Sequence, residues 1–101
     1  MNKNKVEPIR VVRREIVKQK LKGLSIGRVE QYSPFASVSL RYDVPGLLSM
    51  SGSISLNTNV NRLFFTFLGN REFECSDQEP ERMAAIITQK ILARQKIEEA
   101  V

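Results

Sequence analysis

The chain has 101 residues, 42% hydrophobic and 27% charged, which suits one globular domain with its own core. It contains one cysteine and no histidine, which excludes an internal disulfide, a conventional zinc site and histidine-dependent catalysis. No apolar run approaches the roughly 18 residues of a membrane-spanning helix. A lone cysteine fits a reducing compartment, so we expect a cytoplasmic protein. Because the residues of histidine-dependent catalysis are missing, we also expect that it is not an enzyme.

The positive charge is concentrated at the N-terminus. Residues 1–28 carry nine lysine or arginine residues and two glutamates, a net charge of +7, whereas residues 29–101 have a net charge of −2. This asymmetry indicates an anionic partner for the N-terminal quarter, which would be a nucleotide, a nucleic acid or an acidic lipid. The alternative is a solvated basic tail that aids solubility.

The first residues carry almost no apolar side chains. We predict a flexible basic arm over residues 1–8, dispensable for folding, ahead of a single domain over residues 9–101. Residues 9–22 fit neither a helical nor a strand period, although one helix face would gather Ile9, Val12 and Ile16. Helix and strand both stay open for this segment, which Gly23 is expected to end.

The middle of the chain is a succession of predicted strands. Their ranges are 24–32, 36–44, 48–56, 63–68 and 72–75, with turns at 33–34, 45–46, 57–59 and 69–70. The second and third alternate apolar and polar residues, which is typical of half-buried strands. Gly52 falls in the apolar register and indicates a bulge or a close backbone neighbour. The fourth is apolar on both faces, so we expect an internal strand covered by a helix. The core is expected to take Phe64, Phe65, Phe67 and Phe73.

The C-terminal segment, about residues 78–99, is the clearest helix. Ser76 and Glu79 are spaced as a capping box, and acidic residues crowd the first turn. One apolar stripe is predicted to contain Met83, Ile86, Ile87, Ile91 and Ile97. The fold class that follows is α+β: an antiparallel β-meander or small β-barrel of about five to six strands with the C-terminal helix packed on it.

The candidate binding residues lie in the basic segment. Arg10, Arg13 and Arg14 can chelate phosphate, pair with a guanine edge or stack on a base. No aromatic residue precedes Tyr32, so stacking side chains are not interleaved with the charge. Cys75 has no base at hand, and we interpret it as a hydrophobic residue at a strand end.

Residues 36–95 resemble the PilZ domain family. The resemblance is carried by VSLRYDVPG at 38–46, LSMSGSI at 48–54, RLFFTFL at 62–68, ERMAAII at 81–87 and AR at 93–94. In that family a strand ends in a proline-containing turn, a strand with a central glycine follows, and a later strand leads to a C-terminal helix. The resemblance implies a compact β-barrel with that helix against it.

Many PilZ domains bind cyclic di-GMP through R-x-x-x-R and [D/N]-x-S-x-x-G motifs. Arg10 and Arg14 fit the first, on an arm that would order around the ligand. Ser25 fits the serine of the second, where Gly23 replaces the acid or amide, Gly27 lies one residue early and Arg28 takes the last position. The ligand-contacting residues that the resemblance implies are Arg10, Arg13, Arg14, Ser25 and Gly27.

Three functions are therefore open. The resemblance implies a bacterial signalling receiver for cyclic di-GMP that acts on a partner protein, or an adaptor of the same fold without ligand. The basic N-terminus on its own favours a small nucleic-acid-binding protein. The third is a protein-interaction or inhibitor module of phage or plasmid type.

Overall fold

The computed structural model describes residues 5–43 and 49–99. A helix opens the fold, six strands follow, and a second helix closes it. Their bounds are α1 Glu7–Lys18, β1 Leu24–Ile26, β2 Glu30–Tyr32, β3 Phe35–Tyr42, β4 Met50–Asn57, β5 Arg62–Phe67, β6 Asn70–Ser76 and α2 Pro80–Glu99. The predicted α+β class, with a C-terminal helix on an antiparallel meander, is confirmed.

The strands form one antiparallel sheet in the order β1-β3-β4-β5-β6, and β2 pairs with the other half of β3. β1 and β2 share one edge and β6 forms the other, so the sheet is an open meander, not a closed barrel. The strand predicted over 24–32 is divided because its two ends pair with different halves of β3. The turn predicted at 45–46 lies outside the described residues.

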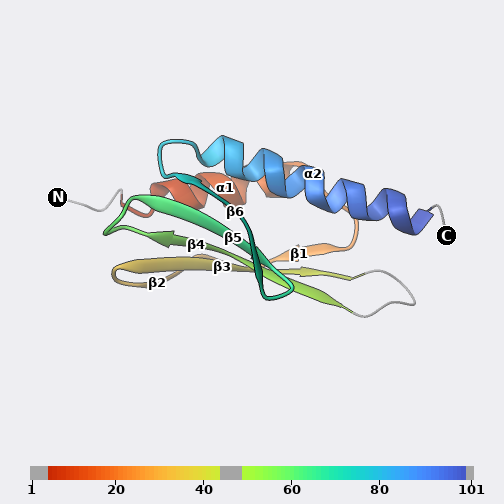
Figure 1. The fold of residues 1–101 in the computed structure, drawn as a ribbon, viewed down its shortest axis with the longest axis horizontal. Coiled ribbons are helices and arrows are strands. Elements are labelled where there is room, and N and C mark those ends of the chain that lie inside the picture. Colours follow the sequence, from red (N-terminus) through yellow and green to blue (C-terminus); the bar gives the residue numbers. More distant parts are fainter. Residues whose placement is uncertain (1–4, 44–48, 100–101) are drawn as a thin grey trace.

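Both helices cover the same face of this sheet (Figure 1). The alternation predicted for β3 is confirmed, since every second side chain is buried beneath the helices. The sheet contributes Ala36, Val38, Leu40, Tyr42, Met50, Ile54, Leu56, Leu63, Phe65 and Cys75 to the buried core. The helices contribute Ile9, Val12, Ile16, Met83, Ala84, Ile87 and Ile91. In the described part of the chain, the opposite face of the sheet carries no helix.

The segment whose period was undecided is helix α1. Pro8 lies in its first turn, where its missing N–H costs nothing. Glu7 and Pro8 therefore belong to the helix, and Val6 packs partly against the core, so the predicted arm over 1–8 is too long at its C-terminal end. The arginines that follow lie on an ordered helix, not on an arm.

The end of α1 also differs from the prediction. The helix stops at Lys18, and Lys20 adopts the left-handed region with φ 49°. Gly23 lies in the turn before β1 with φ 83°, where a side chain would collide with the carbonyl oxygen of Asp43. Gly23 is thus required by that turn and does not cap the helix.

The start of α2 forms without the predicted capping box. The helix begins at Pro80, two residues later than expected. The Ser76 hydroxyl accepts a hydrogen bond from the Gln78 amide at 3.0 Å. The Glu79 carboxylate accepts one from the Arg82 guanidinium at 3.3 Å. The two side chains therefore bond to other partners instead of to each other's backbone amides.

The apolar stripe of α2 ends earlier than the sequence predicts. Ile91 is buried with Tyr42 and Met50, whereas Ile97 is 58% exposed. At that end of the sheet β5 has stopped at Phe67 and β6 starts only at Asn70. The helix continues beyond those two strands, so Ile97 has left the core.

Two further expectations concern the inner strands. The prediction that Phe64 is a core residue is wrong: Phe65 faces the helices, so its neighbour faces the other side, beneath the Arg71 guanidinium at 4.2 Å. The predicted close neighbour of Gly52 is confirmed, because a Cβ there would lie 2.8 Å from the Thr66 carbonyl oxygen. Phe67 and Phe73 are half-buried and pack against the core.

Candidate functional site

Arg10 and Arg14 lie on one side of α1, since residues four apart are neighbours on a helix surface. Both are exposed. Arg14 approaches the Glu7 carboxylate only to 4.0 Å, and both side chains are about half exposed, so this ion pair is weak. Helical geometry thus aligns these guanidinium groups toward solvent, where they can meet an anion.

Arg13 connects α1 to the edge of the sheet. Its Nε donates a 2.6 Å hydrogen bond to the carbonyl oxygen of Gly27, in the link between β1 and β2. The Gly27 amide donates in turn to the Ser39 carbonyl at 2.8 Å, which holds the link against β3. Arg28 follows immediately and is exposed. We call Arg10, Arg13, Arg14 and Arg28 the basic edge.

The other predicted site residues do not join the basic edge in the same way. Ser25 pairs with Arg41 across β1 and β3, and its neighbours Leu24 and Ile26 pack into the core. Its side chain therefore faces the helix-free side of the sheet, away from α1. Gly27 contributes its carbonyl oxygen, and a Cβ there would make only ordinary contacts, so its backbone does not require glycine. The structure brings together Arg13 and Gly27 but separates Ser25 from the arginines.

An exposed aromatic pair was missed in the sequence. Tyr32 and Phe35 are cross-strand partners at the β2–β3 turn and are 59% and 48% exposed. The Tyr32 hydroxyl donates to the Glu30 carboxylate at 3.1 Å. Phe35 also lines a hollow of about 300 Å³ with Lys5 and Val6, just before α1. Two aromatic residues flanking Ser33-Pro34 are the signal that could have indicated this pair.

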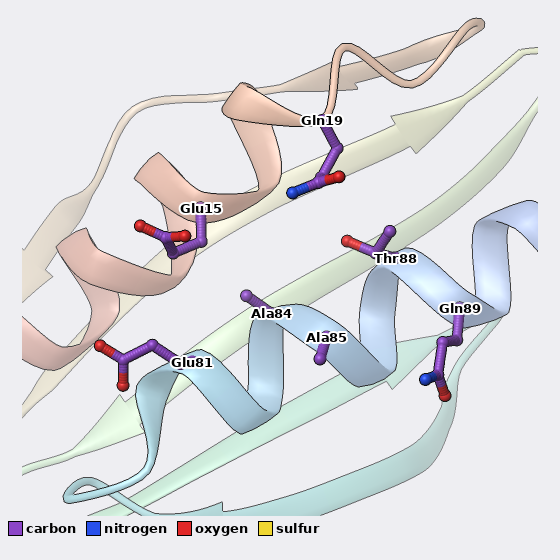
Figure 2. A pocket seen from close by; sticks show the side chains of 7 residues that line it. All are labelled: Glu15, Gln19, Glu81, Ala84, Ala85, Thr88 and Gln89. Carbon is purple, nitrogen blue, oxygen red and sulfur yellow. The ribbon is translucent and has the colours of Figure 1, made fainter.

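A second hollow lies between the two helices (Figure 2). Glu15 and Gln19 of α1 line it opposite Glu81, Ala84, Ala85, Thr88 and Gln89 of α2. Its carboxylates would repel phosphate, and Glu15 is already bound to Lys18 at 2.9 Å. No group of acidic or cysteine side chains suited to a metal ion occurs within residues 5–43 and 49–99. We therefore assign this groove no anion-binding role.

Cys75 has the structural character predicted for it. It is buried opposite Leu63, and its thiol lies 3.5 Å from the Glu79 carbonyl oxygen. Burial raises the pKa of the thiol, with the Glu79 carboxylate adding to the effect. The thiolate needed for nucleophilic or redox chemistry is therefore disfavoured at neutral pH.

The sequence matches no family model, and comparisons with curated proteins and with solved structures give no match. The resemblance to PilZ domains thus stays a prediction. Within the described ranges, neither helix is long and apolar enough to cross a membrane.

Proposed function

We propose that this chain is a non-enzymatic module that binds nucleic acid through its basic edge. The observation that carries the proposal is the hydrogen bond from Arg13 to Gly27, which holds the arginine-bearing helix beside Arg28. The helix that carries three arginines is thereby held against the segment that carries Arg28. Arginine is suited to phosphate because its planar fork donates two parallel hydrogen bonds.

The arrangement favours an extended anion over a small one. A cyclic dinucleotide held by the predicted motifs would have to reach Arg10, Arg14 and Ser25 together, and Ser25 lies on the far side of β1. A nucleic-acid backbone instead repeats its charge and can contact separate cations along an edge. Binding of a nucleic-acid backbone does not require the serine-containing motif of the PilZ family. Lys20 and Lys22, which follow α1 in the chain, are exposed, whereas Lys18 is already paired with Glu15.

Removing two guanidinium groups tests this proposal. Each phosphate contact contributes roughly five- to eightfold in affinity at about 0.1 M salt, as the salt slope per contact implies. Arg10→Ala/Arg14→Ala should therefore bind a fluorescent oligonucleotide roughly 25- to 60-fold more weakly by anisotropy. Both residues are exposed, so the melting temperature should change little.

The matched control is Arg41→Ala/Arg71→Ala, which removes the same charge from exposed positions on the helix-free side of the sheet. It should bind within about twofold of the wild type, apart from the small effect of net charge. Equal losses in the two double variants would mean that affinity follows total charge and that the basic edge is not the site.

The same titration examines the alternative implied by the PilZ resemblance. If cyclic di-GMP were the ligand, Arg14→Ala would remove a charge-assisted contact and lower its affinity about tenfold to a hundredfold. Binding of cyclic di-GMP by the wild type, together with no binding of oligonucleotide, would replace the present proposal. If neither binds, an adaptor for a partner protein becomes the working hypothesis.

A further inference from the structure

We propose that the helix-free face of the sheet binds an arginine side chain of a partner protein, at a site formed by Glu30, Tyr32 and Phe35. We call these three residues the aromatic corner. Tyr32 and Phe35 are direct cross-strand partners at the β2–β3 turn, and they are 59% and 48% exposed. The inference does not depend on the proposed function, because the aromatic corner and the basic edge share no residue.

All three side chains of the corner lie on the helix-free face. Ala36 is buried beneath the helices, so Phe35, its neighbour on β3, points to the opposite side. Tyr32 is paired with Phe35 across the ladder and therefore shares its face. Glu30 lies two residues before Tyr32 on β2, on that same face, and its carboxylate accepts a 3.1 Å hydrogen bond from the Tyr32 hydroxyl.

The two rings of the corner have no cationic partner within the described residues. The cation–π contacts in residues 5–43 and 49–99 run from Arg71 to Phe64 at 4.2 Å and from Arg82 to Phe73 at 5.4 Å. Those two phenylalanines are half-buried, whereas both rings of the corner are exposed. The chain thus places its own arginines over other rings and leaves the more exposed pair to solvent.

The carboxylate of the corner also has no ion pair in the part of the chain that the structure describes. Glu30 forms none even with Arg28, two residues earlier. Two arginines of the helix-free face are held by carboxylates of their own: Arg41 by Asp43 at 3.1 Å, and Arg62 by Glu74 at 3.0 Å. The corner therefore presents one uncompensated negative charge beside two open rings.

This combination is complementary to a cation. An aromatic ring attracts a cation over its face, and a neighbouring carboxylate adds a charge-assisted hydrogen bond. Arginine suits both contacts, because its planar guanidinium can stack on a ring while its edge donates to an oxygen. The Tyr32 hydroxyl occupies one oxygen of Glu30, and the other can accept from the guanidinium. A phosphate would instead meet the Glu30 charge, so a nucleic-acid backbone does not fit this site.

Small side chains border the corner. Ser37 is the cross-strand partner of Glu30, and Ser55 of β4 is paired in turn with Ser37. A guanidinium beside the Glu30 carboxylate would therefore meet hydroxyl groups, which can accept further hydrogen bonds, and no bulky side chain.

The corner is also held in shape before any partner arrives. The Thr58 amide and hydroxyl each donate to the Pro34 carbonyl oxygen at 2.9 Å, which ties the turn between the two rings to the connection after β4. The hydrogen bond to Glu30 fixes the outer end of Tyr32. Binding would thus order few groups of this chain, which favours even a small contact.

The test is an NMR titration of the full chain with a short, end-capped glycine peptide that has one central arginine. The arginine peptide should shift the amide signals of Glu30, Tyr32 and Phe35, with a Kd in roughly the millimolar range. A peptide with citrulline, which has the shape of arginine without its charge, should leave these signals in place. Unshifted signals with the arginine peptide, or equal shifts with both peptides, would overturn the inference.

Variants separate the two kinds of contact. Glu30→Gln should weaken binding of the arginine peptide about twofold to fivefold, the effect of one exposed ion pair. Tyr32→Leu/Phe35→Leu keeps apolar surface without rings and should weaken it about twofold to fivefold for each ring that the guanidinium contacts. All three positions are exposed, so the amide signals of the core should stay unchanged in both variants.

The matched control is Glu81→Gln. Glu81 is an exposed carboxylate of α2, in the groove between the helices, and it also has no ion pair among the described residues. The substitution removes the same charge from the other layer of the molecule, so the affinity for the arginine peptide should not change. Equal losses in Glu81→Gln and Glu30→Gln, or full affinity in the leucine variant, would contradict binding at the aromatic corner.

Sedimentation of the wild type examines a second copy of this chain as the occupant. The chain should sediment as a monomer. A dimer that dissociates in Glu30→Gln would show that the arginine comes from a second copy, and would overturn the assignment to a partner protein. None of these measurements involves an oligonucleotide, so their failure leaves nucleic-acid binding by the basic edge untouched.

Discussion

Replacing Phe65 by alanine should lower the free energy of unfolding by about 3–5 kcal/mol, the cost usual for a fully buried phenylalanine. Its ring is inaccessible to solvent and lies between the sheet and the helix layer, stacked against Phe67 at a centroid distance of 6.0 Å. Alanine would leave a cavity that the surrounding strands can close only in part. Small domains are stable by roughly 5–15 kcal/mol, so chemical denaturation should show a large shift of the midpoint.

Phe64→Ala is the matched control, because it removes the same side chain from the next position of the same strand. Phe64 faces the helix-free side and contacts the Arg71 guanidinium. The substitution removes a partly buried ring and a cation–π contact worth about 0.5–1 kcal/mol, so the free energy of unfolding should fall by less than about 2 kcal/mol. Equal costs for the two variants would contradict the assignment of the helices to one face of the sheet.

Ile87→Ala should cost about 2–5 kcal/mol, because Ile87 is fully buried on the face of α2 that contacts the core. The same substitution ten residues later is the control. Ile97 is 58% exposed, so Ile97→Ala should change stability by no more than about 0.5 kcal/mol. Urea denaturation of the two variants measures how far along α2 the core extends. A larger loss at Ile97 than at Ile87 would show that the helix packs on a different side.

The strands were predictable because their signal is local. The alternation of apolar residues predicts which side chains of β3 are buried, and the glycine in the apolar register of β4 predicts a close backbone neighbour. The structure agrees with both predictions. The sequence does not decide between helix and strand for α1, because only Ile9, Val12 and Ile16 of its residues are buried and its other positions mix basic, acidic and apolar side chains. Its helical form depends on the sheet beneath it, which the sequence period does not report.

The wrong predictions for the end of the apolar stripe on α2 and for the strand over 24–32 also have tertiary causes. Ile97 keeps the period of the stripe on α2, but that period carries no information on where β5 and β6 end. The break after β1 arises because β1 and β2 pair with different halves of β3, residues far from both in the sequence. Strand pairing, not local propensity, decides these positions.

The candidate site was predictable only in part. The sequence singles out Arg10 and Arg14 but expects them on an arm that orders around a ligand, whereas the structure places both on one side of helix α1. The contact between Arg13 and Gly27 spans 14 residues and could not be inferred from local pattern. The family motif grouped Ser25 with the arginines by sequence proximity, whereas the alternation of β1 turns it to the other face.

The salt dependence of oligothymidine binding to the wild-type chain tests the basic edge most directly. Each phosphate contact to a single strand contributes a slope of about −0.7 in a plot of log K against log salt concentration. Three or four contacts from the basic edge predict a slope of roughly −2 to −3, which should fall by about 1.4 in magnitude in Arg10→Ala/Arg14→Ala. A slope near zero, or one that the double substitution leaves unchanged, would contradict nucleic-acid binding by this surface.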